Sequence, residues 1–294
     1  MININKLLCL GAVLAIAVSA AGCGSNAKSS EIEKEDSSEA ASVSENSASD
    51  SNKDSSQEEK SNIGPYLSKT AKNYEKGSYT LKSTITSNSY ENDIKLTRVV
   101  DGDNIYQLQE EKTGKYGVVS VGEKAYDFDY AAGMYIEAKS VPTQNVIQEV
   151  VKQNLPMTDV SEQFKEKGFV EEQYTFTGDT YITNVIFYFD EKSGDLKKYK
   201  MRYSIEGQDD IIETRTIDSL SNNVDKSVFN MDFLKKMTNF DSLSEDERLE
   251  FCKNVCTKKG ITTDMLNEFG LKTDSFKTVD FDTFFNLIYT YSNK

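Results

Sequence analysis

Alternation of apolar and polar residues is the main signal between residues 79 and 220. Tyr79, Leu81 and Ile85 alternate with polar residues, and Ile94, Leu96 and Val100 repeat the pattern after a short break. Such a period of two is typical of half-buried strands. Further segments of this kind occupy 105–108, 116–121, 126–130, 172–177, 181–189, 196–205 and 211–220. We therefore predict about eight or nine strands in an antiparallel meander with one buried and one wet face.

Helical spacing interrupts this pattern at the start, the middle and the end of the folded region. We predict short helices over 66–74, which Gly77 ends, over 146–151, which stops before Pro156, and over 161–167. Ser244 and Glu247 have the form of a capping box, so a helix is expected from there to Gly260. Two more helices are predicted over 263–269 and 280–291. The pattern predicts an α+β fold with a helical C-terminal extension, which either forms a subdomain or covers the sheet.

The N-terminus has the order of a lipoprotein signal. Lys6 precedes an apolar run from Leu7 to Val18, and small residues lead to Ala20-Ala21-Gly22-Cys23. The run is shorter than the roughly 20 residues of a membrane span. We predict cleavage before Cys23 and lipidation (diacylglyceryl and palmitate-type acyl chains) of its thiol, although Ala20 stands where Leu is more usual. The alternative is an ordinary signal or an uncleaved anchor with a chance cysteine.

Four regions follow from these patterns: a signal peptide at 1–22, a lipidated linker at 23–63, an antiparallel β domain at 64–232 and a helical extension at 233–294. The linker is rich in Ser and acids and lacks aromatic residues. It cannot bury enough apolar surface to offset chain entropy, so we expect a tether. The expected location is the extracytoplasmic face of the cell membrane.

Charge and composition exclude several functions. The formal net charge is −14, so we expect no nucleic-acid partner and no attraction to anionic lipid surfaces. The chain contains no His, which excludes Ser–His–Asp and Cys–His catalysis and His-ligated metals. We predict no catalytic residue, no cofactor and no metal.

The middle of the chain resembles the lipoprotein-localisation-factor-like (LolA-like) and LppX-like family of bacterial lipoproteins. The helix at 66–74, the meander, the hairpin from Phe187 to Leu196 and the closing Val224–Phe229 segment carry this resemblance, over about 64–232. It implies a curved antiparallel half-barrel with helices plugging its concave side and a cavity for acyl chains. Two departures are the tether, which disfavours shuttling between membranes, and the helical tail after residue 235.

The apolar strand face supplies the candidate ligand-binding residues, which are Leu81, Ile85, Leu96, Tyr174, Phe176, Phe187, Phe189, Met201 and Tyr203. They either line an apolar ligand cavity or form a packed core sealed by the helices, and the pattern alone favours the core.

Other chemistry-bearing groups have simpler explanations. Cys252 and Cys256 lie on one face of a predicted helix. They are either two small buried apolar residues, a strained disulfide or metal ligands. Hairpin turns explain the acids at 101–104 and 190–195 better than calcium does. Acid pairs at 127/129, 209/210 and 280/282 could serve a hydrolase only at a catalytic spacing.

Two functions therefore stay open. The first is an anchored module that binds a lipid or other apolar ligand at the cell envelope. The second is a structural or interaction protein with a solid core, which would bind an envelope protein. A deep apolar cavity would favour the first, and a filled interior the second.

Overall fold

The computed structural model describes residues 62–89, 92–138, 141, 145–177, 181–205, 207 and 209–292. The predicted signal peptide, Cys23 and nearly all of the linker lie outside the described residues. No helix in the described part is both long and apolar enough to cross a membrane.

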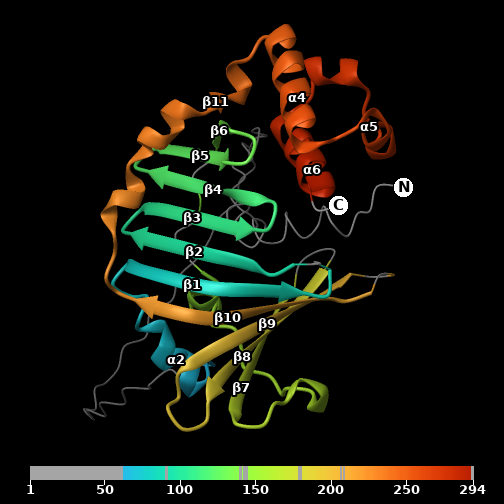
Figure 1. Cartoon of the computed structure of the whole chain (residues 1–294). Coiled ribbons are helices and arrows are strands. Elements are labelled where there is room, and N and C mark those ends of the chain that lie inside the picture. The colour runs from blue at the N-terminus through green and yellow to red at the C-terminus, as the bar shows by residue number, and fades with distance from the viewer. Residues whose placement is uncertain are drawn as a thin grey trace, which may run out of the picture.

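Eleven strands of the described chain form one open sheet (Figure 1). They are β1 (Ser78–Ser87), β2 (Ile94–Asp101), β3 (Asn104–Glu111), β4 (Gly114–Val121), β5 (Lys124–Asp129), β6 (Met134–Ala138), β7 (Phe169–Thr177), β8 (Tyr181–Asp190), β9 (Leu196–Ile205), β10 (Ile211–Ser221) and β11 (Thr238–Asn239). Their spatial order is β11-β6-β5-β4-β3-β2-β1-β10-β9-β8-β7. All neighbours are antiparallel except β11 and β6.

Two meanders make up the sheet. Strands β1 to β6 form one and β7 to β10 the other, and pairing between β1 and β10 joins them. Figure 1 shows β7–β9 running steeply across the direction of β2–β5, so the sheet is strongly curved. Register shifts at Lys82/Ser83 and at Tyr188/Phe189 mark bulges, which add local twist and bending.

The sequence predicted fewer strands than the sheet contains. The nine alternating segments correspond to β1–β5 and β7–β10, while β6 and β11 were missed. Strand β6 is only five residues long and follows directly on the turn at 130–133, so its alternation is brief. Strand β11 has two residues and no periodicity to detect.

The side chains of Tyr79, Leu81 and Ile85 define what we call the inner face of the sheet. Helices α2 (Pro65–Ala71) and α3 (Val146–Lys152) cover its β7–β10 half, because Leu67 and Val150 join a cluster with Tyr79 and Leu81. Helix α3 begins with a capping box formed by Asn145 and Gln148. The predicted first helix ends early, at Ala71, and only a 3-10 turn (η2, Glu162–Phe164) forms within 161–167.

The C-terminal extension has a cluster of its own and also covers the sheet. Two 3-10 segments, η3 (Lys226–Phe229) and η4 (Met231–Lys236), lead from β10 into the extension. The extension itself contains 3-10 segments η5 (Phe240–Ser242) and η6 (Thr273–Lys277) and helices α4 (Glu245–Lys259), α5 (Thr263–Phe269) and α6 (Phe281–Ser292). Met134 of β6 is buried within the cluster of these helices, and Tyr116 of β4 contacts the rings of Phe285 and Tyr289. The expected capping box of Ser244 and Glu247 begins α4.

Segment η4 instead covers the opposite, outer face. Its Leu234 is buried with Val119 and Phe128, whose side chains alternate with those of the inner face. The α+β class, the curved antiparallel sheet, the covering helices and the helical extension are all as predicted.

Candidate functional site

The nine candidate residues all lie on the inner face, as strand alternation predicted. Six of them share one buried cluster, and Phe176 packs against it from a partly buried position. The six are Leu81, Tyr174, Phe187, Phe189, Met201 and Tyr203. Ile85 and Leu96 instead form a separate buried cluster with Ile94. The structure therefore brings seven candidates together and places two apart.

Side chains fill the space between α2, α3 and the sheet. Tyr174, Phe187 and Phe189 are 0% exposed and Met201 is 1% exposed. Residues that line a water-sized cavity retain accessible surface, so these values describe a packed layer. Aromatic contacts continue this layer. The ring centroids of Tyr174 and Phe187 lie 5.9 Å apart, and the ring of Tyr66 on α2 stacks on that of Phe189 with 5.4 Å between centroids.

Glu172, which the sequence analysis missed, fixes helix α2 to the sheet. This carboxylate is 2% exposed and accepts hydrogen bonds from the backbone N–H groups of Tyr66 and Leu67, at 2.9 and 3.0 Å. It also accepts one from the Tyr174 hydroxyl at 2.9 Å, and that hydroxyl accepts from Gly64 N–H. The only sequence signal was an acid in register with Tyr174 and Phe176 on an otherwise apolar face.

A polar row crosses the inner face beside the apolar cluster. Arg98 donates to Gln107 at 2.7 Å on neighbouring strands, and Arg215 pairs with Glu213 at 2.6 Å. Although burial opposes it, the Glu213 carboxylate raises the pKa of Arg215. The inner face is therefore amphipathic and not uniformly apolar.

A groove opens beside α2, where β9 and β10 diverge. Pairing of these strands ends at Lys198 and Thr216, whereas β10 continues along β1 to Ser221. The cavity holds about 370 Å³, within the size range of small-molecule sites. Its lining combines the apolar Tyr74, Leu196, Ile217 and Leu220 with the polar Lys69, Thr70, Asn73, Asp195, Lys197, Asp218 and Ser219.

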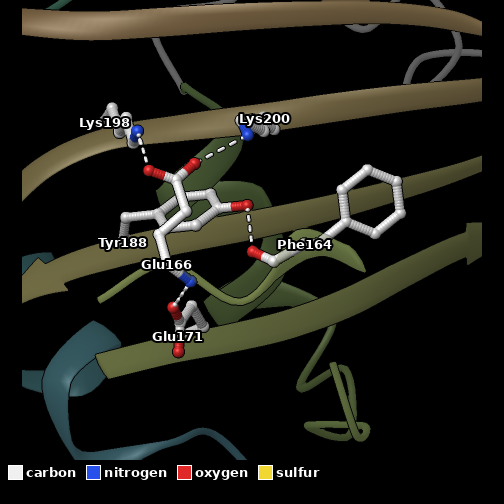
Figure 2. Close-up of polar contacts among 6 residues, drawn as sticks. All are labelled: Phe164, Glu166, Glu171, Tyr188, Lys198 and Lys200. Atoms are coloured by element: carbon white, nitrogen blue, oxygen red, sulfur yellow. Dashed lines mark hydrogen bonds and ion pairs between the residues drawn. The ribbon is translucent and has the colours of Figure 1, made fainter. Parts of the chain in front are cut away.

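The outer face of the same strands carries a compact polar cluster. Figure 2 shows Glu166 reaching Lys198 and Lys200, whose Nζ atoms lie 2.6 and 2.7 Å from its two oxygens. The Tyr188 hydroxyl donates to the carbonyl of Phe164 at 2.8 Å (Figure 2). Burial opposes ionisation, but the hydrogen bonds from Lys198 and Lys200 prevail and lower the pKa of Glu166. The cluster joins both lysines to one carboxylate and pins the 161–168 loop to the sheet.

The remaining chemistry-bearing groups have structural roles. Cys252 and Cys256 are buried free thiols, and no group of three or more Cys, Asp, Glu or His in the described residues could hold a metal. Asp101 pairs with Lys226 and accepts from Ser78, while Asp190 accepts the backbone N–H groups of its own turn. Hairpin chemistry thus accounts for the turn that begins at Asp190, whereas Asp101 is held by residues of other segments.

The fold and these sites define an α+β protein with a helix-covered amphipathic inner face and a small groove beside it. No family model matches the chain, and no curated protein matches it. A solved domain from Vibrio parahaemolyticus, described as an outer membrane lipoprotein-sorting protein domain, is similar over 57% of this chain and 97% of that domain. The two share 12% sequence identity with a TM-score of 0.27. The function is therefore argued from this chain's own residues.

Proposed function

We propose that this chain is a lipid-anchored binding protein on the extracytoplasmic face of the cell membrane, and that its ligand is a lipid or another apolar molecule. Lipidation of Cys23 supplies the anchor, and the acidic, Ser-rich linker supplies the reach. The binding surface is the inner face under α2 and α3. The role is binding without catalysis.

The observation that carries this proposal is the thinness of the layer over the inner face. Rings and aliphatic chains from β1, β7, β8 and β9 are covered by two helices of seven residues each. Helices this short are not stable by themselves in water, so their position depends on packing against the sheet. An apolar ligand that replaces this packing can displace them at small cost.

The fixed points of α2 indicate how it would move. Its first turn is held by Glu172, whereas no side-chain cap holds its N-terminus from within the helix. Tyr74, just beyond the C-terminal end, packs edge-on against Tyr79 at 4.8 Å. The groove is lined by Tyr74 and so lies at the C-terminal end of α2. In this proposal that end rises from the sheet and breaks the Tyr74–Tyr79 contact, while Glu172 acts as a hinge contact.

Extraction of non-covalently bound lipid tests the proposal. We would purify the full acylated chain from bacterial membranes, extract it with organic solvent and analyse the extract by mass spectrometry. Acyl chains on Cys23 are covalent and remain with the protein, and exchange into lipid-free detergent removes membrane lipid around the anchor. Lipid that is extracted after this exchange therefore reports the inner face. The proposal requires stoichiometric extractable lipid or an equivalent apolar molecule. An empty extract, together with no displacement of an apolar dye, would contradict it.

A second function is favoured by the packed interior. A domain whose inner face is filled by its own side chains can serve as a rigid body that binds another envelope protein. Hydrogen exchange separates the two possibilities. A lipid-binding domain would show fast opening of α2 and α3 and slow exchange in β8 and β9, whereas a rigid body would protect all of these segments alike.

A further inference from the structure

The groove beside α2 has four charged residues in its lining, which are Lys69, Lys197, Asp195 and Asp218. Lys197 lies 3.5 Å from Asp195, and Lys69 Nζ lies 3.7 Å from the position that a Cβ of Gly194 would occupy. The Ser193 hydroxyl, and then the ammonium groups of Lys197 and Lys69, lower the pKa of Asp195. Lys197 is therefore paired with Asp195, and Lys69, from a distant part of the chain, lies beside the neighbouring Gly194.

The second acid of the lining, Asp218, has a partner outside the groove. Asp218 is the extra residue of the β10 bulge, and its carboxylate accepts a hydrogen bond from the Thr84 hydroxyl at 2.9 Å. Thr84 alternates with Ser83 and Ile85, so its side chain lies on the outer face. This hydrogen bond ties the Asp218 carboxylate to the outer face, whereas Asp195 faces Lys197 within the lining.

The Asp195 pair is also loose. The side chains of Lys197 and Asp195 are 48% and 62% exposed, whereas Lys198, Lys200 and Glu166 in the outer-face cluster are 20%, 22% and 30% exposed at shorter distances. An exposed pair at 3.5 Å contributes little to stability and is readily exchanged for another anion. Asp195 therefore acts as a replaceable partner of the two lysines.

The apolar part of the lining continues into the inner-face cluster. Tyr74 belongs to that cluster, and Leu196, Ile217 and Leu220 pack against it from partly buried positions. A molecule in the groove would have lysines at its solvent end and apolar side chains at its inner end. This polarity matches an amphiphile with a negatively charged end group.

We infer that the groove between α2 and the diverging ends of β9 and β10 binds the anionic end group of an amphiphile, a carboxylate or a phosphate, through Lys69 and Lys197. The apolar chain of the ligand lies against Tyr74 and Ile217 and enters the layer under α2. This inference rests on the proposed function and names the entry side and the ligand class.

Charge-matched variants of the full-length protein in nanodiscs test the inference. Octanoate and octyl phosphate are the anionic probes, with octyl glucoside and octyltrimethylammonium as neutral and cationic controls. Hydrogen exchange of peptides covering 66–74 and 190–199 reports binding at the groove without counting probe dissolved in the disc. Octanoate and octyl phosphate distinguish a fatty-acid from a phospholipid type of head group.

The variants change how strongly the anionic probes bind, and the aspartate and lysine variants should act in opposite directions. Asp195→Asn removes the internal anion and should lower the half-maximal concentration of both anionic probes by about twofold to fivefold. Lys69→Gln and Lys197→Gln should raise it by about the same factor. Lys192→Gln, on the same hairpin but outside the lining, is the control and should leave it unchanged.

Two results would overturn the inference in different ways. Equal protection by octyl glucoside, with no response to the charge variants, would show a groove that does not recognise anions, and the proposed function would stand. No protection by any octyl probe at the groove or on β7–β9 would remove the inference and the proposed function together. Because Asp195→Asn is expected to tighten binding, a folding defect cannot imitate the predicted result.

Discussion

Glu172 occupies the space next to Gly64 where any larger residue would need its Cβ, and its carboxylate joins the first turn of α2 to β7. The two residues are far apart in sequence, yet the carboxylate of Glu172 leaves no room for a side chain at residue 64. Gly64 is extended, with φ −62° and ψ 156°, so the need for glycine is one of space and not of backbone conformation.

We predict that Glu172→Ala destabilises the domain by about 2–4 kcal/mol, because it leaves two backbone N–H groups and a tyrosine hydroxyl without their buried acceptor. Gly64→Ala should cost about 1–3 kcal/mol through overpacking against the carboxylate. Urea denaturation followed by circular dichroism measures both. Glu123→Gln, at an exposed turn, is the control. Full stability of both variants would show that α2 is not held by this contact.

Asp127 should make stability depend on pH in the direction opposite to most carboxylates. Burial, and then the charge of Asp282 on α6, raise the pKa of Asp127 to about 6. The folded protein therefore keeps a proton that the unfolded chain loses above about pH 4. This group adds stability as pH falls from 7 through 6 towards 4, and the gain is lost again as pH rises.

Asp127→Asn should accordingly raise the unfolding free energy by about 1–2 kcal/mol at pH 7.5 and change it little at pH 4.5. Denaturant titrations at both pH values check this prediction. Asp103→Asn, at an exposed turn, serves as the matched variant. An equal effect of Asp127→Asn at both pH values would mean that the carboxylate is not desolvated against α6.

Cys252 and Cys256 should behave as unreactive thiols in the native state. Burial, followed by the neighbouring Cys256, raises the pKa of Cys252 to about 12. Burial alone raises the pKa of Cys256 to about 11. Because the thiolate is the nucleophile, we predict slow modification by Ellman's reagent at pH 8 until the chain is unfolded. Asn254→Cys, on the exposed side of α4, should react at once. Rapid native labelling of Cys252 or Cys256 would contradict their burial.

Membrane retention is predicted to depend on one thiol. Cys23→Ala should move the protein from the membrane fraction to the soluble extracytoplasmic fraction, or leave an unprocessed precursor. Two or more acyl chains give firm attachment, so their loss should weaken it. Fractionation with immunoblotting and intact mass measures this. A variant that is processed, acylated and retained like the parent would exclude Cys23 as the anchor.

Strand periodicity was sufficient to predict which side chains share the inner face, because the alternation of Tyr174, Phe176, Phe187 and Phe189 is local information. It was not sufficient for Glu172, whose role depends on where α2 lands on the sheet. The groove could not be predicted from the sequence for the same reason. Lys69 and Lys197 line one groove because β9 stops pairing with β10 at Lys198 and Thr216, and no local pattern encodes that divergence.

Photo-crosslinking with a diazirine-labelled fatty acid tests the central claim most directly. The acylated full-length protein would be loaded with the probe, irradiated, digested and mapped by mass spectrometry. The account predicts adducts on inner-face peptides from α2 and β7–β9, around Tyr74, Tyr174, Phe187 and Met201, which unlabelled fatty acid competes away. Adducts confined to exposed outer-face peptides, or adducts that no competitor reduces, would contradict an apolar binding site under α2 and α3.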